Sequence, residues 1–303
     1  MEEQVVIVAG IDCGSNSTRL LISEVENGEI KKLYKTHNVT KTSEGLEESN
    51  KISIDSKKRL FKVLRDYLKE IEKYEASQVL CIGTAVFRDA DNSDEIIEEI
   101  KQKFDINLKV ISGEEEGQNT SIGVLSNPDL NDNFLIVDIG GRSTELIYDN
   151  KKKINVESIN LGVVSLYESW LRQNPITKAE EELAIKFINN NFHISENFTN
   201  RELVGVAGTF TSIGSIFLNQ EKYDEEEIHF KKIDFDWIES FYNKIKSMTV
   251  AQIIANFKSL DPKRGTTLTG GALLILSIMK KFEINELKVS KSDILEGLIL
   301  KNY

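Results

Sequence analysis

The sequence predicts an α/β protein built from two related domains with a ligand cleft between them. Two segments carry the same pattern: residues 11–22 read IDCGSNSTRLLI, and residues 137–148 read VDIGGRSTELIY. Each predicts a buried strand, a glycine loop and a second strand, and each is followed by a similar order of strands and helices. An offset of about 126 residues is too long for a solenoid repeat, so it favours two domains. Two unrelated hairpins with glycine turns are the simpler alternative.

The first half begins with three strands and continues with strand–helix units. Residues 4–12 and 18–26 favour strands, and the Asn27-Gly28 pair predicts a hairpin turn into a third strand. A long amphipathic helix is expected near 55–75, because apolar residues recur along one face. The rest of this half reads as a strand in QVLCIG, a helix in SDEIIEEIKQKF, a strand in NLKVI and a helix from Gly113.

The second half repeats this order. The Asp149-Asn150 pair predicts a turn between its second and third strands, and Thr177 with Glu180 forms a capping box that starts a helix. The segment ELVGVAG then predicts a strand that leads into a further helix. The three opening strands are expected at 133–139, 143–149 and 152–159.

The composition is typical of a globular protein large enough for two domains. Of the 303 residues, 40% are hydrophobic and 29% are charged, and a chain of this length can bury two cores. We expect the domains at 1–121 and 122–291, with a terminal helix at 292–303 that packs back on the first domain. Cys13 and Cys81 lie in strand-like segments without partners at metal-ligand spacing, which predicts reduced core residues in a cytoplasmic protein.

The charge of the chain limits its partners. The net charge of −11, from 49 acidic and 38 basic residues, argues against nucleic acid or a membrane surface as the main partner. The N-terminus lacks the basic region of a signal peptide, and the longest apolar run is too short to span a bilayer. A small or linear polyanion is still compatible with this net charge as a partner, because cationic side chains and a metal ion can reverse the electrostatic field inside a cleft.

Three glycine loops place phosphate-binding groups at strand ends. They contain GSNS, GGRS and AGTFTS, and glycine lets backbone N–H groups approach an anion closely. Hydroxyls, helix starts and nearby arginines add donors, and acids beside the loops suit a divalent metal ion, as phosphoryl transfer requires. The candidate phosphate- or substrate-binding residues are Asp12, Gly14, Ser15, Asn16, Ser17, Arg19, Arg88, Gly140, Gly141, Arg142, Ser143, Gly208, Thr209 and Thr211.

Three consecutive acids follow the strand in LKVI. Glu114, Glu115 and Glu116 fall in the first turn of the helix that begins near Gly113. Acids at this end of a helix favour its positive pole, which is a sufficient explanation for two of them. The alternative for one of the three is that its carboxylate points into the cleft and orients a water molecule.

Seven segments of the chain occur in the order of known family motifs. They are GIDCGSNSTRLLI, GTAVFRDA, VISGEEEG, IVDIGGRSTEL, LGVVSL, GVAGTFTS and LDPKRGTTLTGGALLIL…LKVSKSDILEGLIL. Together they resemble the short members of the exopolyphosphatase and guanosine pentaphosphate phosphohydrolase (Ppx/GppA) family. The resemblance implies two ribonuclease-H-like domains of the actin-like, sugar-kinase-like ATPase superfamily, with the active site in the cleft between them. It also implies Mg²⁺- or Mn²⁺-dependent removal of terminal phosphate from inorganic polyphosphate, guanosine pentaphosphate or both.

The resemblance also implies roles for individual residues. Glu116 matches the catalytic glutamate of the family, and Asp138 and Glu145 match its metal-associated acids. Arg19 and Arg88 match substrate-binding arginines. The chain departs from the family pattern at Gln118, Arg142, Ala207, Thr266 and Leu295.

Arg142 stands where the family has a third glycine. Because arginine does not easily adopt left-handed backbone geometry, the loop must use a conformation open to L-residues. That conformation can leave the N–H groups of Gly140 and Gly141 facing phosphate, with the guanidinium beside it as a bidentate donor. The alternative is an arginine turned out to solvent.

Two other functions stay open at this point. One is a weakly active or non-enzymatic protein of the same fold that binds guanosine penta- or tetraphosphate as a regulator; the other is an ATP-dependent small-molecule kinase. The acids Glu116, Asp138 and Glu145 argue against a pure binder, and no acceptor-binding insertion is recognisable for a kinase. We expect a polyanionic phosphate substrate, no nucleic acid and no membrane as partners, and we leave a homodimer open.

Overall fold

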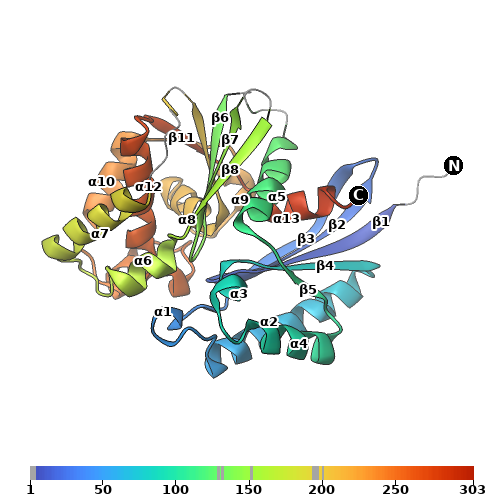
Figure 1. Cartoon of the computed structure of the whole chain (residues 1–303). Helices are drawn as coiled ribbons and strands as arrows, with labels where there is room; N and C mark the ends of the chain where they lie inside the picture. The colour runs from blue at the N-terminus through green and yellow to red at the C-terminus, as the bar shows by residue number, and fades with distance from the viewer. Residues whose placement is uncertain (1–4, 128–129, 131–132, 151–152, 193–197, 200) are drawn as a thin grey trace. The chain divides into compact units, whose positions relative to one another are not determined.

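The computed structural model describes residues 5–127, 130, 133–150, 153–192, 198–199 and 201–303. The chain divides into two compact units (Figure 1). Unit 1 consists of residues 1–128 with 292–303, and unit 2 consists of residues 129–291. Each unit combines one mixed sheet with several helices, so the predicted α/β class is confirmed.

Unit 1 is built on a five-stranded sheet. Its strands are β1 (Val6–Cys13), β2 (Ser17–Glu26), β3 (Glu29–Val39), β4 (Gln78–Gly83) and β5 (Leu108–Val110). They lie in the order β3-β2-β1-β4-β5, where β1, β2 and β3 form an antiparallel meander and β4 and β5 continue parallel to β1. Asn27 and Gly28 connect β2 to β3 with φ angles of 54° and 75°, which confirms the predicted hairpin turn.

Helices cover both faces of this sheet (Figure 1). They are α1 (Leu46–Ser49), α2 (Ile54–Lys73), α3 (Ala85–Asp89), α4 (Ser93–Phe104), α5 (Gly113–Leu125) and α13 (Ile294–Leu300). One core joins α2, α3 and α4 to strand residues such as Ile11 and Leu20, and a second joins α13 to Val8 and Leu21. Because side chains alternate along a strand, β1 and β2 supply both cores. The predicted amphipathic helix is confirmed as α2, and α13 packs on α5 and β1.

Unit 2 is built on a six-stranded sheet. Its strands are β6 (Phe134–Ile139), β7 (Thr144–Asn150), β8 (Lys153–Ile159), β9 (Glu202–Val206), β10 (Lys232–Asp234) and β11 (Glu286–Val289). They lie in the order β10-β11-β9-β6-β7-β8, where β6, β7 and β8 repeat the antiparallel meander and β9 runs parallel to β6. Sequence reasoning missed both β10 and β11, which pair antiparallel with each other. A meander continued by parallel strands is the arrangement that the predicted ribonuclease-H-like fold class requires, and that class is confirmed.

The prediction of a turn at Asp149-Asn150 is wrong. Both residues lie in β7, where they pair with Ile154 and Lys153 of β8. The cross-strand ladder extends through these two residues because pairing with a neighbouring strand outweighs their weak strand propensity. The connection falls at 151–152, outside the described residues.

A single large core joins the helices of unit 2 to its sheet. The helices are α6 (Val163–Ser169), α7 (Lys178–Asn191), α8 (Ala207–Phe217), α9 (Glu225–Ile228), α10 (Phe235–Ile245), α11 (Val250–Asn256), the 3₁₀ turn η1 (Pro262–Arg264) and α12 (Leu268–Lys281). Leu135 of β6, Phe210 of α8 and Leu273 of α12 belong to this core. The predicted capping box at Thr177 and Glu180 is confirmed at the start of α7. Across the described chain, every helix is too short or too polar to cross a membrane.

Candidate active site

The first two predicted glycine loops are matching hairpin turns, one in each unit. The N–H of Gly14 donates to the carbonyl of Ser17, and the N–H of Gly140 donates to the carbonyl of Ser143, at 3.0 Å in both cases. A Cβ on Gly14 would lie 2.9 Å from the Ser17 carbonyl oxygen, so the turn closes this tightly only around glycine. The prediction that the N–H of Gly140 faces phosphate is therefore wrong, because this N–H donates its hydrogen bond within the hairpin. The tips of the turns are Ser15 with Asn16, and Gly141 with Arg142.

The strand positions behind the two turns carry different charges. In unit 1, Asp12 lies opposite Arg19 in the strand register, whereas in unit 2 the equivalent Asp138 lies opposite Glu145. Asp138 and Glu145 are 5% and 0% exposed, and the Ser158 hydroxyl donates to Oε1 of Glu145 at 2.8 Å. Two buried carboxylates at neighbouring positions need positive charge close by. The pair is therefore suited to a cation.

Arg19 binds two acids in unit 1, and one of them escaped the sequence prediction. Its Nε and Nη2 donate to Oδ2 of Asp12 at 2.9 and 2.6 Å, and its Nη1 donates to Oδ2 of Asp293. Burial raises the pKa of Asp12 above its ordinary value, and the charge of Arg19 offsets this rise only in part. Oδ1 of Asp12 is buried without a hydrogen-bond partner among the described residues. A buried carboxylate oxygen without a hydrogen-bond partner can accept a hydrogen bond from a water molecule or a ligand.

Only one of the three glutamates at the start of α5 is buried. Glu115 forms the N-terminal capping box of the helix, and Glu114 is exposed. Glu116 is 8% exposed, and its Oε2 accepts a hydrogen bond from Nη1 of Arg88 at 2.9 Å. The same nitrogen donates to the carbonyl of Ile111, also at 2.9 Å, which fixes the guanidinium beside the helix start. The structure thus brings together two predicted site residues, Glu116 and Arg88.

The second loop is tied to the start of α6. The N–H groups of Val163 and Val164 donate to the carbonyls of the two loop glycines at 3.1 and 2.7 Å. A Cβ on Gly162 would lie 2.4 Å from the backbone nitrogen of Arg142, so only glycine permits this close approach. Arg142 does not have a positive φ angle. The prediction that this loop uses backbone geometry open to L-residues is therefore confirmed.

The third loop, around Gly208, lies beside the second. The Thr209 hydroxyl donates to the carbonyl of Ile139 at the end of β6, at 3.2 Å, and Thr211 is buried. The guanidinium of Arg264 covers Gly208, where an added Cβ would lie 2.0 Å from its Nη1. Sequence reasoning could not place Arg264, because it reaches this loop from the separate turn η1. The candidate site of unit 2 therefore contains two glycine loops, one acid pair and two arginines, Arg142 and Arg264.

Ala207 begins α8 with a φ angle of 66°, in the left-handed region where a Cβ is strained. It occupies one of the positions where the chain departs from the family pattern. We expect Ala207→Gly to raise the free energy of unfolding by about 1 kcal/mol, because glycine removes the Cβ clash. Urea denaturation followed by circular dichroism measures this change.

Ala251, an exposed residue within α11, is the matched control. Ala251→Gly should lower the free energy of unfolding by up to about 1 kcal/mol, because glycine is a poorer helix former than alanine. Opposite signs for the two substitutions support strain at Ala207. A loss of stability in both variants would contradict it.

Asp138 and Glu145 are the predicted metal residues, and they form a pair rather than a cluster. Among the residues described, no group of three or more His, Cys, Asp or Glu side chains is arranged to hold a metal ion. Mg²⁺ is commonly held by one or two protein carboxylates, with substrate phosphates and water completing its shell. The acid pair fits that kind of site.

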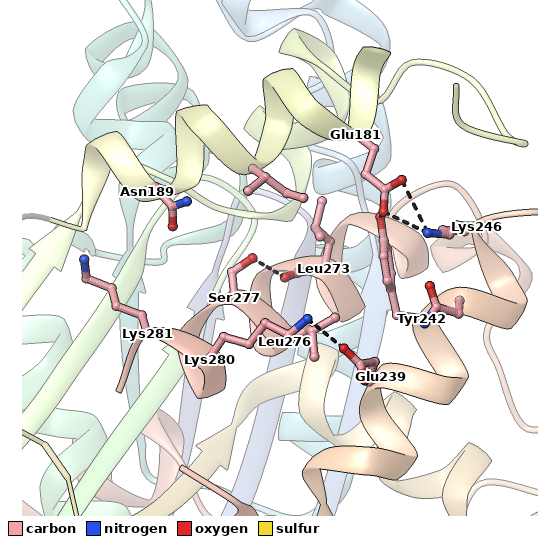
Figure 2. Close-up of a pocket in the computed structure, with 12 residues that line it drawn as sticks. Glu181, Asn189, Glu239, Tyr242, Lys246, Leu273, Leu276, Ser277, Lys280 and Lys281 are labelled. Carbon is pink, nitrogen blue, oxygen red and sulfur yellow. Dashed lines mark hydrogen bonds and ion pairs between the residues drawn. The ribbon is translucent and has the colours of Figure 1, made fainter. Parts of the chain in front are cut away.

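A pocket elsewhere in unit 2 contains none of the predicted site residues. It has a volume of about 470 Å³ and lies among α7, α10 and α12 (Figure 2). Glu181 accepts hydrogen bonds from Tyr242 and Lys246, and Glu239 pairs with Lys280 at 2.7 Å. Lysines thus neutralise the two lining glutamates.

Comparison with known proteins identifies the family. The model of the Ppx/GppA phosphatase family matches residues 21–303. The chain belongs to this family. The match begins after Arg19, so the first glycine loop of this Ppx/GppA protein lies outside the matched residues.

Three relatives of this Ppx/GppA chain have names that describe an activity. A bifunctional 3-dehydroquinate synthase/phosphatase of Fusobacterium nucleatum is 34% identical over 97% of this chain and 46% of its own length. Exopolyphosphatase 2 of Mycobacterium tuberculosis is 26% identical over 97% of both chains. A guanosine-5'-triphosphate,3'-diphosphate pyrophosphatase of Vibrio parahaemolyticus is 26% identical over 97% of this chain and 58% of its own length. The chain therefore spans nearly the whole of one relative and a much smaller part of the other two.

Solved structures confirm the Ppx/GppA fold. The Aquifex aeolicus family member is 25% identical, with a TM-score of 0.83 over 99% of this chain and 98% of that chain. An exopolyphosphatase-like protein is 24% identical, with a TM-score of 0.92 over 99% of this chain and 98% of that chain.

Proposed function

We propose that this chain is a metal-dependent phosphohydrolase that removes terminal phosphate from inorganic polyphosphate, guanosine pentaphosphate or both. The observation that carries the proposal is the burial of Glu116 against Arg88, while its two neighbouring acids cap the helix or face solvent. Membership of a phosphatase family supplies the reaction class. The names exopolyphosphatase and guanosine-5'-triphosphate,3'-diphosphate pyrophosphatase, which belong to two relatives, support the choice of substrates.

Glu116 orients the attacking water in this proposal. A carboxylate is a weak base, but the loose transition state of phosphoryl transfer requires positioning of the nucleophile more than strong proton abstraction. Arg88 holds the carboxylate through a charge-assisted hydrogen bond of 2.9 Å, which limits the rotation of the side chain. A water molecule bound to Glu116 would therefore keep one orientation.

The donors for phosphate come from the glycine loops in this proposal. Arg264, held over Gly208 at the start of α8, adds a cation to the helix N–H groups there. We predict that phosphate-binding donors of both units bind the same substrate molecule. In addition to Arg264, the proposed donors are Ser15, Asn16, Ser17 and Arg19 of unit 1, and Gly141, Arg142, Ser143, Thr209 and Thr211 of unit 2.

We assign Mg²⁺ or Mn²⁺ to Asp138 and Glu145. The support is the burial of two carboxylates at paired positions of β6 and β7, where the equivalent pair of unit 1 contains an arginine. Oxygen ligands of this kind suit both ions. When bound, the ion would neutralise the charge of the transferring phosphate.

Phosphate release tests the proposal. The purified full chain should release orthophosphate from long-chain polyphosphate and from guanosine pentaphosphate without forming ADP, and EDTA should stop the reaction. Asp138→Asn should raise the Mg²⁺ concentration for half-maximal rate by about tenfold or more, because one of two anionic ligands is lost. Asp149→Asn, which makes the same charge change further along the same hairpin, should leave it unchanged. Absence of release, or release only with ADP formation, would overturn the proposed function.

A further inference from the structure

Arg19 is a proposed phosphate donor, yet in unit 1 it already binds two carboxylates. Three of its five N–H groups are directed at Oδ2 of Asp12 and Oδ2 of Asp293. The three side chains are largely buried, with 18%, 5% and 7% exposure for Arg19, Asp12 and Asp293. Ion pairs shielded from water in this way are strong, so a ligand must compete with them.

The position of Asp293 is fixed by the helix that it begins. Asp293 is the N-cap of α13, and its Oδ1 accepts a hydrogen bond from the N–H of Leu295 at 3.2 Å. The start of α13 lies directly on α5, because a Cβ on Gly123 would come within 2.0 Å of the Asp293 carbonyl oxygen. The carboxylate therefore stays beside Arg19 unless α13 itself moves.

The charges of Arg19 and its two acidic partners sum to a negative value. Asp12, Arg19 and Asp293 together carry −1, and the adjacent ion pair of Lys35 with Glu296, at 2.8 Å, adds none. Burial acts to raise the pKa of Asp293, but the charges of Arg19 and Lys35 and the N–H of Leu295 outweigh it and hold that pKa below its ordinary value. A phosphate that approaches Arg19 therefore meets more negative than positive charge.

We propose that Asp293 is a specificity-determining residue that competes with substrate phosphate for Arg19 and so weakens the binding of metal-free, highly charged phosphate anions. The inference rests on the proposed function, in which Arg19 binds phosphate. A substrate whose charge is partly neutralised by a divalent ion experiences less repulsion from the two carboxylates. Asp293 thereby favours metal-bound phosphate over free polyanion.

Asp293→Asn tests this inference with little risk to the fold, because asparagine caps a helix as well as aspartate does. Calorimetric titration with tripolyphosphate in EDTA should give a Kd about tenfold lower for the variant than for the parent, which corresponds to about 1.4 kcal/mol. The gain should be much smaller with excess Mg²⁺. It should also disappear when Arg19→Ala is added, because the effect operates through Arg19.

Asp234→Asn is the matched control. Asp234 is the N-cap of α10 in unit 2, so the substitution makes the same charge change at an equivalent helix position. Its affinity for tripolyphosphate should equal that of the parent. Four results would overturn the inference: equal affinity of Asp293→Asn and parent, weaker binding by the variant, a gain that survives Arg19→Ala, or no binding by either protein.

Phosphate release by the parent separates the two proposals. An inactive parent contradicts the proposed function, whereas an active parent with an unchanged Kd in Asp293→Asn contradicts only this inference.

Discussion

Glu116→Gln should lower turnover of polyphosphate at least about 100-fold, the usual scale for loss of a general base. Glutamine has nearly the same shape and can still accept a hydrogen bond from Arg88, but its amide is not a base. Substrate binding should stay close to that of the parent, since the substitution affects the attacking water rather than the phosphate donors. Initial rates of phosphate release over a range of substrate concentrations separate kcat from KM.

Glu114→Gln is the control for this experiment. Glu114 lies in the same helical turn, is exposed and accepts a hydrogen bond from Gln118 at 3.2 Å. The variant carries the same change in net charge near the helix start, so an effect of charge alone would appear in both proteins. Parent-like activity of Glu116→Gln would show that the assigned role is wrong.

Gly297→Ala should reduce the free energy of unfolding by about 3 kcal/mol or more, the upper range for overpacking. A Cβ on Gly297 would lie 1.7 Å from the carbonyl oxygen of Asn119 and 2.9 Å from the backbone nitrogen of Gly123. These are backbone atoms of α5, which cannot rotate away as a side chain could. The helices α13 and α5 must therefore separate, and urea denaturation should detect the loss.

Gly270→Ala is the matched substitution in unit 2. Gly270 is a buried glycine of α12, and its Cβ would meet nothing closer than 3.5 Å, at Leu171. The added methyl should therefore be neutral or stabilise by up to about 1 kcal/mol, because alanine is the better helix former. A Gly297→Ala protein as stable as Gly270→Ala would contradict the close packing of α13 on α5.

Most strands and helices could be predicted because local periodicity and turn residues determine them. The apolar run of β1, the amphipathic face of α2 and the Asn27-Gly28 turn are properties of neighbouring residues. Prediction failed at Asp149-Asn150, where strand pairing overrode local turn preference, and at β10 and β11, which have only three and four residues. Short elements depend on a neighbour in space, and the chain order alone does not show that neighbour.

The candidate site was predictable to the extent that its parts are close in sequence. The first two loops are each flanked by their acid and its strand partner, so the pattern of residues 11–22 and 137–148 was visible. Asp293 lies 274 residues after Arg19, and Arg264 reaches Gly208 from another turn, so neither contact has a local signal. The hydrogen bond that the N–H of Gly140 donates within its own hairpin was missed. A glycine motif does not show which N–H groups form hydrogen bonds inside the turn. That the two units are related domains stays a prediction, supported by their shared hairpin register.

The return of α13 to unit 1 sets an order for folding during synthesis. Unit 2 is one continuous stretch, residues 129–291, whereas unit 1 needs residues from both sides of that stretch. One face of the unit 1 sheet, with Val8, Leu21 and Ile82, obtains its apolar cover from Ile294 and its neighbours in α13. Until α13 leaves the ribosome, this face stays open to water or to a chaperone. The part of unit 1 that is made before unit 2 is thus completed by a helix that is made after unit 2.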